Sequence, residues 1–159
     1  MVTQTRLIEL LSYDLDTGVF TRRAGVGPTH IGDVAGNPCH GYWQICIDGR
    51  SYYAHRLAWL YMTGEWPKEQ IDHINMDKTD NRWNNLRLAT PSQNTCNQSA
   101  RSTNKVGMKG VSPNGKRFSA QITIDGTCHH LGTFDTPALA HSAYADAAAI
   151  LHGTFAREK

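Results

Sequence analysis

Short turns between β-forming segments set the strongest limit on how this 159-residue chain can fold. Asp48-Gly49 separates residues 42–47 from residues 50–54, and both flanks are rich in aromatic and β-branched side chains. The second half holds two more such turns, Pro113-Asn114-Gly115 and Asp125-Gly126. These turns separate three strand candidates: 108–112, 117–124 and 127–133. Because turns this short join antiparallel strands, the sequence predicts small antiparallel sheets in both halves of the chain.

Helix signals alternate with these strands. Residues 55–63 predict a buried helix, and the apolar spacing over 137–152 predicts a helix that covers the C-terminal strands. Thr90-Pro91-Ser92-Gln93 has the form of a capping box, which predicts a helix from Pro91 to about Ser99. Helices and antiparallel sheets together place the chain in the α+β class.

Residues 100–106 are small, polar and basic, and they form the best candidate for a linker. We therefore expect one domain over residues 1–99 and a second over residues 107–157. The N-terminus lacks the form of a signal peptide, and no apolar run approaches the length of a membrane span. The expectation is a soluble, intracellular protein without a membrane partner.

The charge is unevenly distributed, although the net charge is only +2. No acidic residue occurs between Asp80 and Asp125, and this stretch carries seven basic residues. They are Arg82, Arg87, Arg101, Lys105, Lys109, Lys116 and Arg117. A long basic stretch suits a polyanion, because Lys and Arg displace the counterions condensed on phosphates. The alternative is an ordinary solvated basic surface.

The segment 71–97 is dominated by Asn and Asp, and it also holds His73. A turn-rich loop explains most of these residues, but less readily the acid–imidazole pair Asp72-His73 at a strand end. Hydrolysis of a phosphodiester needs a base near neutral pKa and a cation held by hard oxygen ligands. His73 fits the first need, and Asp72 with Asn94 fits the second. Neighbours in a strand point to opposite faces, so Asp72 and His73 can share a site only where the strand ends or bulges.

Four motifs in this order resemble the HNH endonucleases of bacteriophages and mobile introns. They are His55-Arg56-Leu57-Ala58-Trp59, Asp72-His73-Ile74-Asn75, Asn81-x-x-Asn84-Asn85-Leu86-Arg87 and Gln93-Asn94-x-x-Asn97. The resemblance covers about residues 13–98 and implies a ββα-metal fold that holds one divalent ion, Mg²⁺ or Mn²⁺. By position, it implies that His73 is the general base, that Asp72 and Asn94 are the metal ligands, and that Asn85 braces the loop and orients the histidine.

Other polar residues of the N-terminal domain have two interpretations each. His55 contacts the site or is a satisfied core histidine, and Asn97 touches DNA or caps a structural element. Arg87 binds a phosphate or lies at the surface of a strand edge. Cys39, His40 and Cys46 do not have the spacing of a zinc finger, and none of the four cysteines forms a Cys-x-x-Cys pair. No structural zinc is expected.

The C-terminal domain resembles the AP2/ERF DNA-binding domain over about residues 104–157. The most diagnostic string is Leu131-Gly132-Thr133-Phe134-Asp135-Thr136, supported by Phe118-Ser119-Ala120-Gln121-Ile122 and Ala143-Tyr144-x-x-Ala147-Ala148. The resemblance implies a three-stranded sheet that enters the major groove while one helix packs behind it. The expected DNA-facing residues of this sheet are Lys109, Lys116, Arg117, Gln121, Thr123 and His129. The base-reading arginines of the family are replaced by Ser112, Thr123 and His130, so sequence preference does not transfer.

Together these resemblances imply a phage-type, site-directed DNA endonuclease of the homing type, located in the cytoplasm, which is that of the host cell if a phage encodes the protein. We expect a monomer on double-stranded DNA that nicks one strand with one metal ion per chain. Arg87, Arg101 and Lys105 are expected to add phosphate contacts to those of the C-terminal sheet. Two alternatives remain: a non-catalytic DNA-binding regulator on a degenerate HNH scaffold, and a nuclease directed at RNA.

Overall fold

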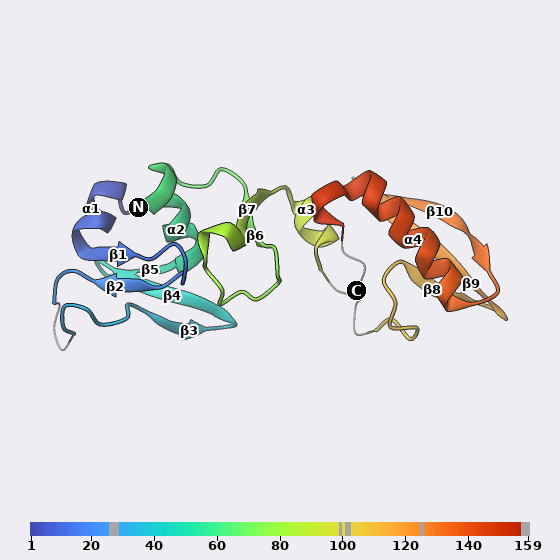
Figure 1. Ribbon diagram of the computed structural model, residues 1–159, viewed down its shortest axis with the longest axis horizontal. Coiled ribbons are helices and arrows are strands. Elements are labelled where there is room, and N and C mark those ends of the chain that lie inside the picture. Colours follow the sequence, from blue (N-terminus) through green and yellow to red (C-terminus); the bar gives the residue numbers. More distant parts are fainter. Residues whose placement is uncertain (26–28, 99, 101–102, 125, 157–159) are drawn as a thin grey trace. The chain divides into compact units, whose positions relative to one another are not determined.

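The computed structural model describes residues 1–25, 29–98, 100, 103–124 and 126–156. The chain divides into two compact units, Met1–Ala89 and Thr90–Lys159, and each is described by itself (Figure 1). Both units combine helices with antiparallel strands, as the sequence predicts for an α+β chain. Among the described residues, none of the helices has the length and apolar character needed to cross a membrane.

The first unit contains three small antiparallel sheets, with strand orders β1-β2, β3-β4-β5 and β6-β7. Its elements in chain order are α1 (Gln4–Leu10), β1 (Leu11–Tyr13), β2 (Phe20–Arg22), β3 (Asn37–Cys39), β4 (Tyr42–Ile47), β5 (Arg50–Tyr53), α2 (Ala54–Thr63), β6 (Gln70–His73), η1 (Trp83–Asn85) and β7 (Leu86–Ala89). Helix α2 ends where the sequence predicts, because Gly64 adopts a left-handed conformation and its N–H bonds to the carbonyl of Leu60.

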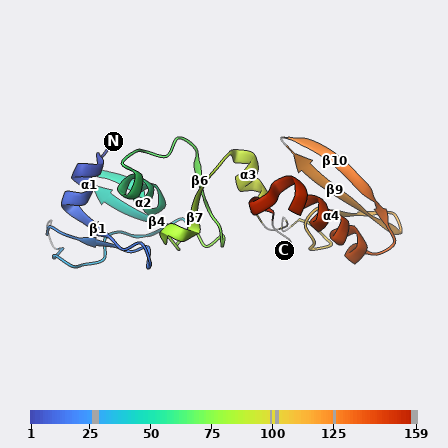
Figure 2. The same ribbon diagram turned by 45° about the horizontal axis from the view of Figure 1, so that its top comes forward.

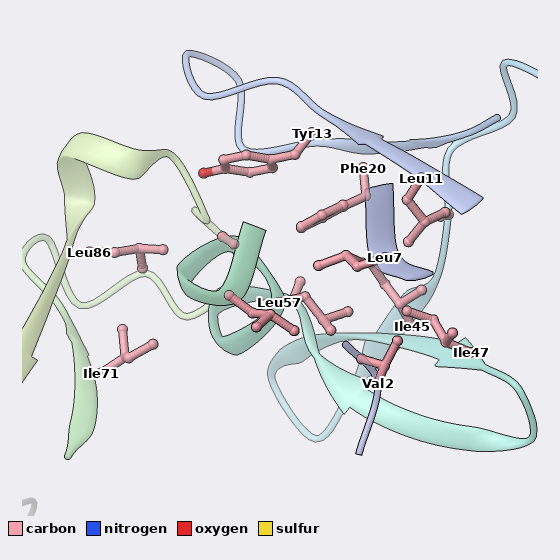
Figure 3. Packing of buried hydrophobic residues seen from close by; sticks show 14 residues of the cluster. Val2, Leu7, Leu11, Tyr13, Phe20, Ile45, Ile47, Leu57, Ile71 and Leu86 are labelled. Carbon is pink, nitrogen blue, oxygen red and sulfur yellow. The ribbon is translucent and has the colours of Figure 1, made fainter. Parts of the chain in front are cut away.

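The core of the first unit joins both helices to the sheets. Leu7 of α1, Phe20 of β2, Ile45 of β4 and Leu57 of α2 are almost completely buried in one cluster (Figure 3). Ile71 and Leu86 extend this cluster to β6 and β7, so the hairpin is anchored to the core by apolar side chains. Burial of side chains of this kind contributes about 1.5–3 kcal/mol each. The anchored hairpin carries the polar residues that the sequence singles out.

The second unit consists of a three-stranded antiparallel sheet and two helices. Its elements are α3 (Pro91–Cys96), β8 (Val111–Asn114), β9 (Arg117–Ile124), β10 (Thr127–Phe134), α4 (Pro137–His152) and η2 (Gly153–Phe155). The strand order is β10-β9-β8, and α4 lies along one face of this sheet (Figure 2). Tyr144 of α4 is buried beside Ile122 of β9. A side chain at Gly110 would collide with the Tyr144 ring, and Gly110 also has a positive φ, so glycine is required there.

Several boundaries differ from the sequence prediction. Strand β8 begins at Val111 rather than Met108, because Gly107 and Gly110 both have positive φ and turn the chain before it. Helix α3 ends at Cys96 rather than Ser99. The boundary between the two compact units falls between Ala89 and Thr90, earlier in the chain than the expected linker. The reason is that α3 packs with η2 and so belongs to the second unit. The extent of the functional domains stays a prediction.

Candidate active site

Strand β6 carries Asp72 and His73 at the end of the β6–β7 hairpin. Both residues are buried, with 4% and 5% exposure, and they pair across the hairpin with Arg87 and Leu86. The strand ends at His73, and the Ile74 N–H bonds to the carbonyl of Asn85 in the following turn. The strand end that would let Asp72 and His73 share a site is therefore present.

The carboxylate of Asp72 forms a buried ion pair with Arg87. The Nε and Nη2 atoms of Arg87 both lie 2.8 Å from Oδ2 of Asp72. The two side chains are only 5% and 16% exposed, so solvent screens this pair much less than a surface ion pair. Arg87, expected as a phosphate contact or a surface residue, is thus bound to the expected metal ligand.

An amide fixes the orientation of the His73 imidazole. The Nδ2 atom of Asn81 donates to the carbonyl of Thr79 at 3.0 Å, so the amide oxygen faces His73. That oxygen lies 3.4 Å from Nε2 of His73, a long hydrogen bond for which Nε2 must be the donor. In the neutral ring, Nε2 therefore carries the proton and Nδ1 carries the lone pair.

The position of Asn81 is itself held by a long-range contact. The Tyr13 hydroxyl donates to the backbone carbonyl of Asn81 at 2.7 Å, from strand β1 to the loop after β6. Gly18 lies against the backbone of Asn81 and Arg82, where a Cβ atom would overlap. In the sequence, Asn81 belongs to the motif Asn81-x-x-Asn84-Asn85-Leu86-Arg87, but no local pattern indicates a role for it. Its place in that motif is the sequence signal that could have singled it out. Its contact with His73 follows only from the fold.

Burial controls the protonation of His73. It lowers the pKa of the imidazole, while the Asn81 hydrogen bond and the charges of Asp72, Asp77 and Asp80 act in the opposite direction. The net effect is a lowered pKa. His73 is therefore neutral at physiological pH, which is the state that can accept a proton.

Two aromatic rings, those of His55 and Tyr42, lie close to His73, and a third, that of Tyr53, stacks on His55. The His55 ring lies edge-to-face with His73, with ring centres 5.1 Å apart, and it stacks on Tyr53 at 5.5 Å. The centre of the Tyr42 ring lies 5.4 Å from the centre of the His55 ring and 6.4 Å from that of His73. His55 is 7% exposed and its Nδ1 has no hydrogen-bond partner in the described part of the chain. His55 therefore contacts the site, and it is not a satisfied core histidine.

Asn85 braces the loop between β6 and η1. Its Oδ1 accepts the Asn75 N–H at 3.0 Å, and its Nδ2 donates to the Asn75 side chain at 3.0 Å and to the Asp80 carbonyl at 2.8 Å. Asp80 in turn forms an ion pair with Arg82 at 2.6 Å, which lowers the pKa of Asp80 to about 2. These contacts hold the loop that carries Asn81, so the link from Asn85 to His73 is indirect.

Asn94 lies on α3 in the second unit. The predicted capping box is present, with the Thr90 and Gln93 side chains each accepting a backbone N–H of the other residue. Asn97 is the C-cap residue of α3 and is 5% exposed. The carboxylate of Asp72 and the amide of Asn94 are hard oxygen donors, which suit Mg²⁺ or Mn²⁺ better than zinc. Their pairing at one ion stays a prediction.

The expected DNA-facing residues of the second unit do not share one face of the sheet. Gln121 pairs with His130, and Thr123 pairs with Cys128, so these side chains lie on one face. His129 pairs with Ile122, whose side chain is buried under α4, and therefore belongs to the opposite face. His130, and not His129, therefore lies on the same face as Gln121 and Thr123, and the contact of this face with DNA stays a prediction.

The basic residues of the second unit have different surroundings. The Nζ atom of Lys109 donates to the carbonyls of Cys96 and Gln98 and so closes the end of α3. Arg117 donates to the Thr133 carbonyl at 3.0 Å and forms an exposed ion pair with Asp135. The positions of Lys105 and Lys116 are exposed, whereas Arg101 lies outside the described residues.

The sequence of the chain is similar to those of known proteins. A family model described as HNH endonuclease matches residues 52–96, a segment that contains Asp72, His73, Asn85 and Asn94. The chain is 36% identical over 116 residues to "Uncharacterized HNH endonuclease L560" of Acanthamoeba polyphaga mimivirus, a match covering 72% of this chain and 60% of the relative. It is 32% identical over 106 residues to "Protein 3.8" of Escherichia phage T7, a match covering 65% of this chain and 87% of that protein. The chain belongs to the HNH endonuclease family.

Proposed function

We propose that the chain is a metal-dependent DNA endonuclease that hydrolyses phosphodiester bonds with His73 as general base. The observation that carries this proposal is the fixed, neutral imidazole of His73 beside the carboxylate of Asp72. The Asn81 amide, anchored at Thr79 and by Tyr13, holds this buried histidine in one tautomer, and such an arrangement suits proton transfer.

The roles of the site residues follow from their contacts. Nδ1 of His73 takes a proton from the attacking water, and the Asn81 oxygen stabilises the Nε2–H of the resulting imidazolium. Tyr42 and His55 pack against the ring and keep the imidazole in place. Asn85 keeps the loop that carries Asn81 in register. Each of these residues acts on the same proton transfer, either directly or through the position of His73.

The carboxylate of Asp72 and the amide of Asn94 would hold one divalent cation, Mg²⁺ or Mn²⁺. When bound, the ion stabilises the charge that develops on the leaving 3′-oxygen. Its donors are both oxygens and include only one charge, which favours an ion that shares its coordination shell with the phosphate. One such site per chain supports nicking of a single strand by a monomer.

The second unit is proposed to anchor the enzyme on double-stranded DNA in the manner of an AP2-like domain. Its support is the antiparallel sheet β8–β10 with α4 on one face and polar residues on the other, among them Gln121, Thr123 and His130. Polar side chains that alternate along a strand can contact base edges in the major groove. A site-directed enzyme of the homing type accords with relatives that come from a phage and a giant virus.

The test is incubation of the full chain with supercoiled plasmid in Mg²⁺, in Mn²⁺ and in EDTA. We expect conversion to the nicked circle with either metal and none in EDTA. A single-stranded RNA of the same sequence serves as the alternative substrate and should stay intact. DNA binding without nicking in any metal would instead indicate a non-catalytic regulator.

A further inference from the structure

Arg87 occupies an unexpected position for a DNA-contacting residue, because its guanidinium is bound to the expected metal ligand Asp72. We infer that Arg87 neutralises Asp72 in the free protein, so that the metal ion is bound together with the DNA phosphate and only weakly before it. This inference rests on the proposed function, since it concerns the metal site of the same nuclease.

The geometry of the pair makes Arg87 an effective competitor. Two guanidinium nitrogens lie 2.8 Å from the same carboxylate oxygen of Asp72. The two residues are also direct partners in the antiparallel pairing of β6 and β7, so the backbone keeps them opposite each other. Both side chains are shielded from solvent, and charges in such surroundings interact more strongly than at the surface.

The two proposed ligands themselves carry little net charge to attract a free cation. The Asp72 and Arg87 charges cancel, and the proposed second ligand, Asn94, is a neutral amide. Of the nearby acids, Asp80 is paired with Arg82 at 2.6 Å, and Asp77 is exposed, so water and salt screen its charge. Because the affinity of oxygen sites for divalent cations rises with the number of charged ligands, this site should hold Mg²⁺ weakly in the free protein.

A phosphodiester changes this balance. It brings a negative charge and oxygen ligands that complete the coordination of the cation, and Mg²⁺ is commonly held by one or two carboxylates together with substrate phosphates. The guanidinium of Arg87 can also donate to a phosphate oxygen. DNA therefore offsets the repulsion between Arg87 and the metal, and the reactive metal assembles only on the substrate.

The test measures Mn²⁺ binding to the full chain by electron paramagnetic resonance, without and with a short DNA duplex. Arg87→Gln removes the charge while its amide can still donate to Asp72. It should bind Mn²⁺ on the order of tenfold more tightly than the wild type in the absence of DNA, since a nearby positive charge is removed. The duplex should tighten Mn²⁺ binding by the wild type more than by Arg87→Gln.

Two further variants complete the experiment. Arg87→Lys keeps the charge and should bind Mn²⁺ as weakly as the wild type. Arg82→Gln removes a neighbouring charge that belongs to Asp80 and should change Mn²⁺ affinity much less than Arg87→Gln. Tryptophan fluorescence checks that each variant is folded, because Trp43, Trp59, Trp66 and Trp83 all lie in the first unit.

The outcomes separate this inference from the proposed function. Equal or weaker Mn²⁺ binding by folded Arg87→Gln, with metal-dependent nicking intact in the wild type, overturns the inference alone, because Arg87 would then position Asp72 for the metal. Absence of Mn²⁺ binding in every sample, with and without DNA, overturns the inference and the proposed metal site together.

Discussion

Acidification should destabilise the first unit through His55, and His55→Phe should remove that part of the acid sensitivity. Burial, followed by the charges of His73 and Arg56, lowers the pKa of His55 from 6.5 to about 3. The rings of Tyr42 and Tyr53 cover the same imidazole and supply no charge that would favour its protonation. His55 therefore stays neutral in the folded chain over a range in which the unfolded chain binds a proton.

The sign and the size of the effect follow from linkage. Between pH 6.5 and about 3 the unfolded state binds more protons at this residue, so the free energy of unfolding falls as the pH falls. The contribution is complete above pH 6.5 and is lost as the pH approaches the folded-state value. Protonation of His55 in the unfolded chain makes the free energy of unfolding about 2 kcal/mol lower at pH 5 than at pH 8.

The assay is urea unfolding at pH 8 and pH 5, followed by tryptophan fluorescence, which reports on the first unit. Phe keeps a ring that can stack on Tyr53 but cannot bind a proton. From pH 8 to pH 5 the free energy of unfolding of the wild type should fall by about 2 kcal/mol more than that of His55→Phe. His30→Gln is the matched control, because the His30 side chain is 85% exposed. This variant should show the same pH dependence of the free energy of unfolding as the wild type. Identical pH dependence in the wild type and His55→Phe would refute the reasoning.

Three further substitutions test the surroundings of His73. Tyr13→Phe removes the hydroxyl that donates to the Asn81 carbonyl at 2.7 Å, and it should lower the free energy of unfolding by about 1–3 kcal/mol. An unchanged urea midpoint would contradict this role for Tyr13. Gly18→Ala places a Cβ atom against the Asn81 and Arg82 backbone at a φ of +73°, and the same measurement should show a loss of at least about 2 kcal/mol. The Lys78 ammonium lies 4.9 Å from the centre of the Tyr42 ring, close enough to the site for a phosphate contact. Lys78→Gln should reduce the slope of log K against log salt concentration by about 0.9 in DNA-binding titrations, and an unchanged slope would exclude that contact.

Features with local causes could be predicted from the sequence. Asp48 and Gly49 both have positive φ, the conformation that a two-residue hairpin turn requires, and the Asp-Gly pair predicts it directly. The capping box at Thr90 and Gln93 likewise depends on residues three positions apart. The strand end at His73 was inferred from the loop-forming residues that follow it. In each case the deciding interaction lies within a few residues of chain.

Features that depend on register or long-range packing could not be predicted. The pairing of Asp72 with Arg87 follows from the alignment of β6 with β7, which no local pattern specifies. His129 was expected on the face of Gln121 and Thr123 but lies on the opposite one, because one step along a strand reverses the side-chain direction. The hydrogen bond between Asn81 and His73 needs a loop held from strand β1 by Tyr13. The Nδ1 of His55, which has no hydrogen-bond partner among the described residues, likewise depends on packing from several elements.

The central claim, that His73 activates water for phosphodiester hydrolysis, is tested most directly by the rate of plasmid nicking by His73→Ala. The measurement uses wild type and variant under identical Mn²⁺ concentration, with a gel shift to show that both still bind DNA. General-base catalysis contributes about 10²–10⁴-fold, so the account predicts at least about a hundredfold slower nicking with DNA binding retained. Nicking by His73→Ala at the wild-type rate would contradict the account.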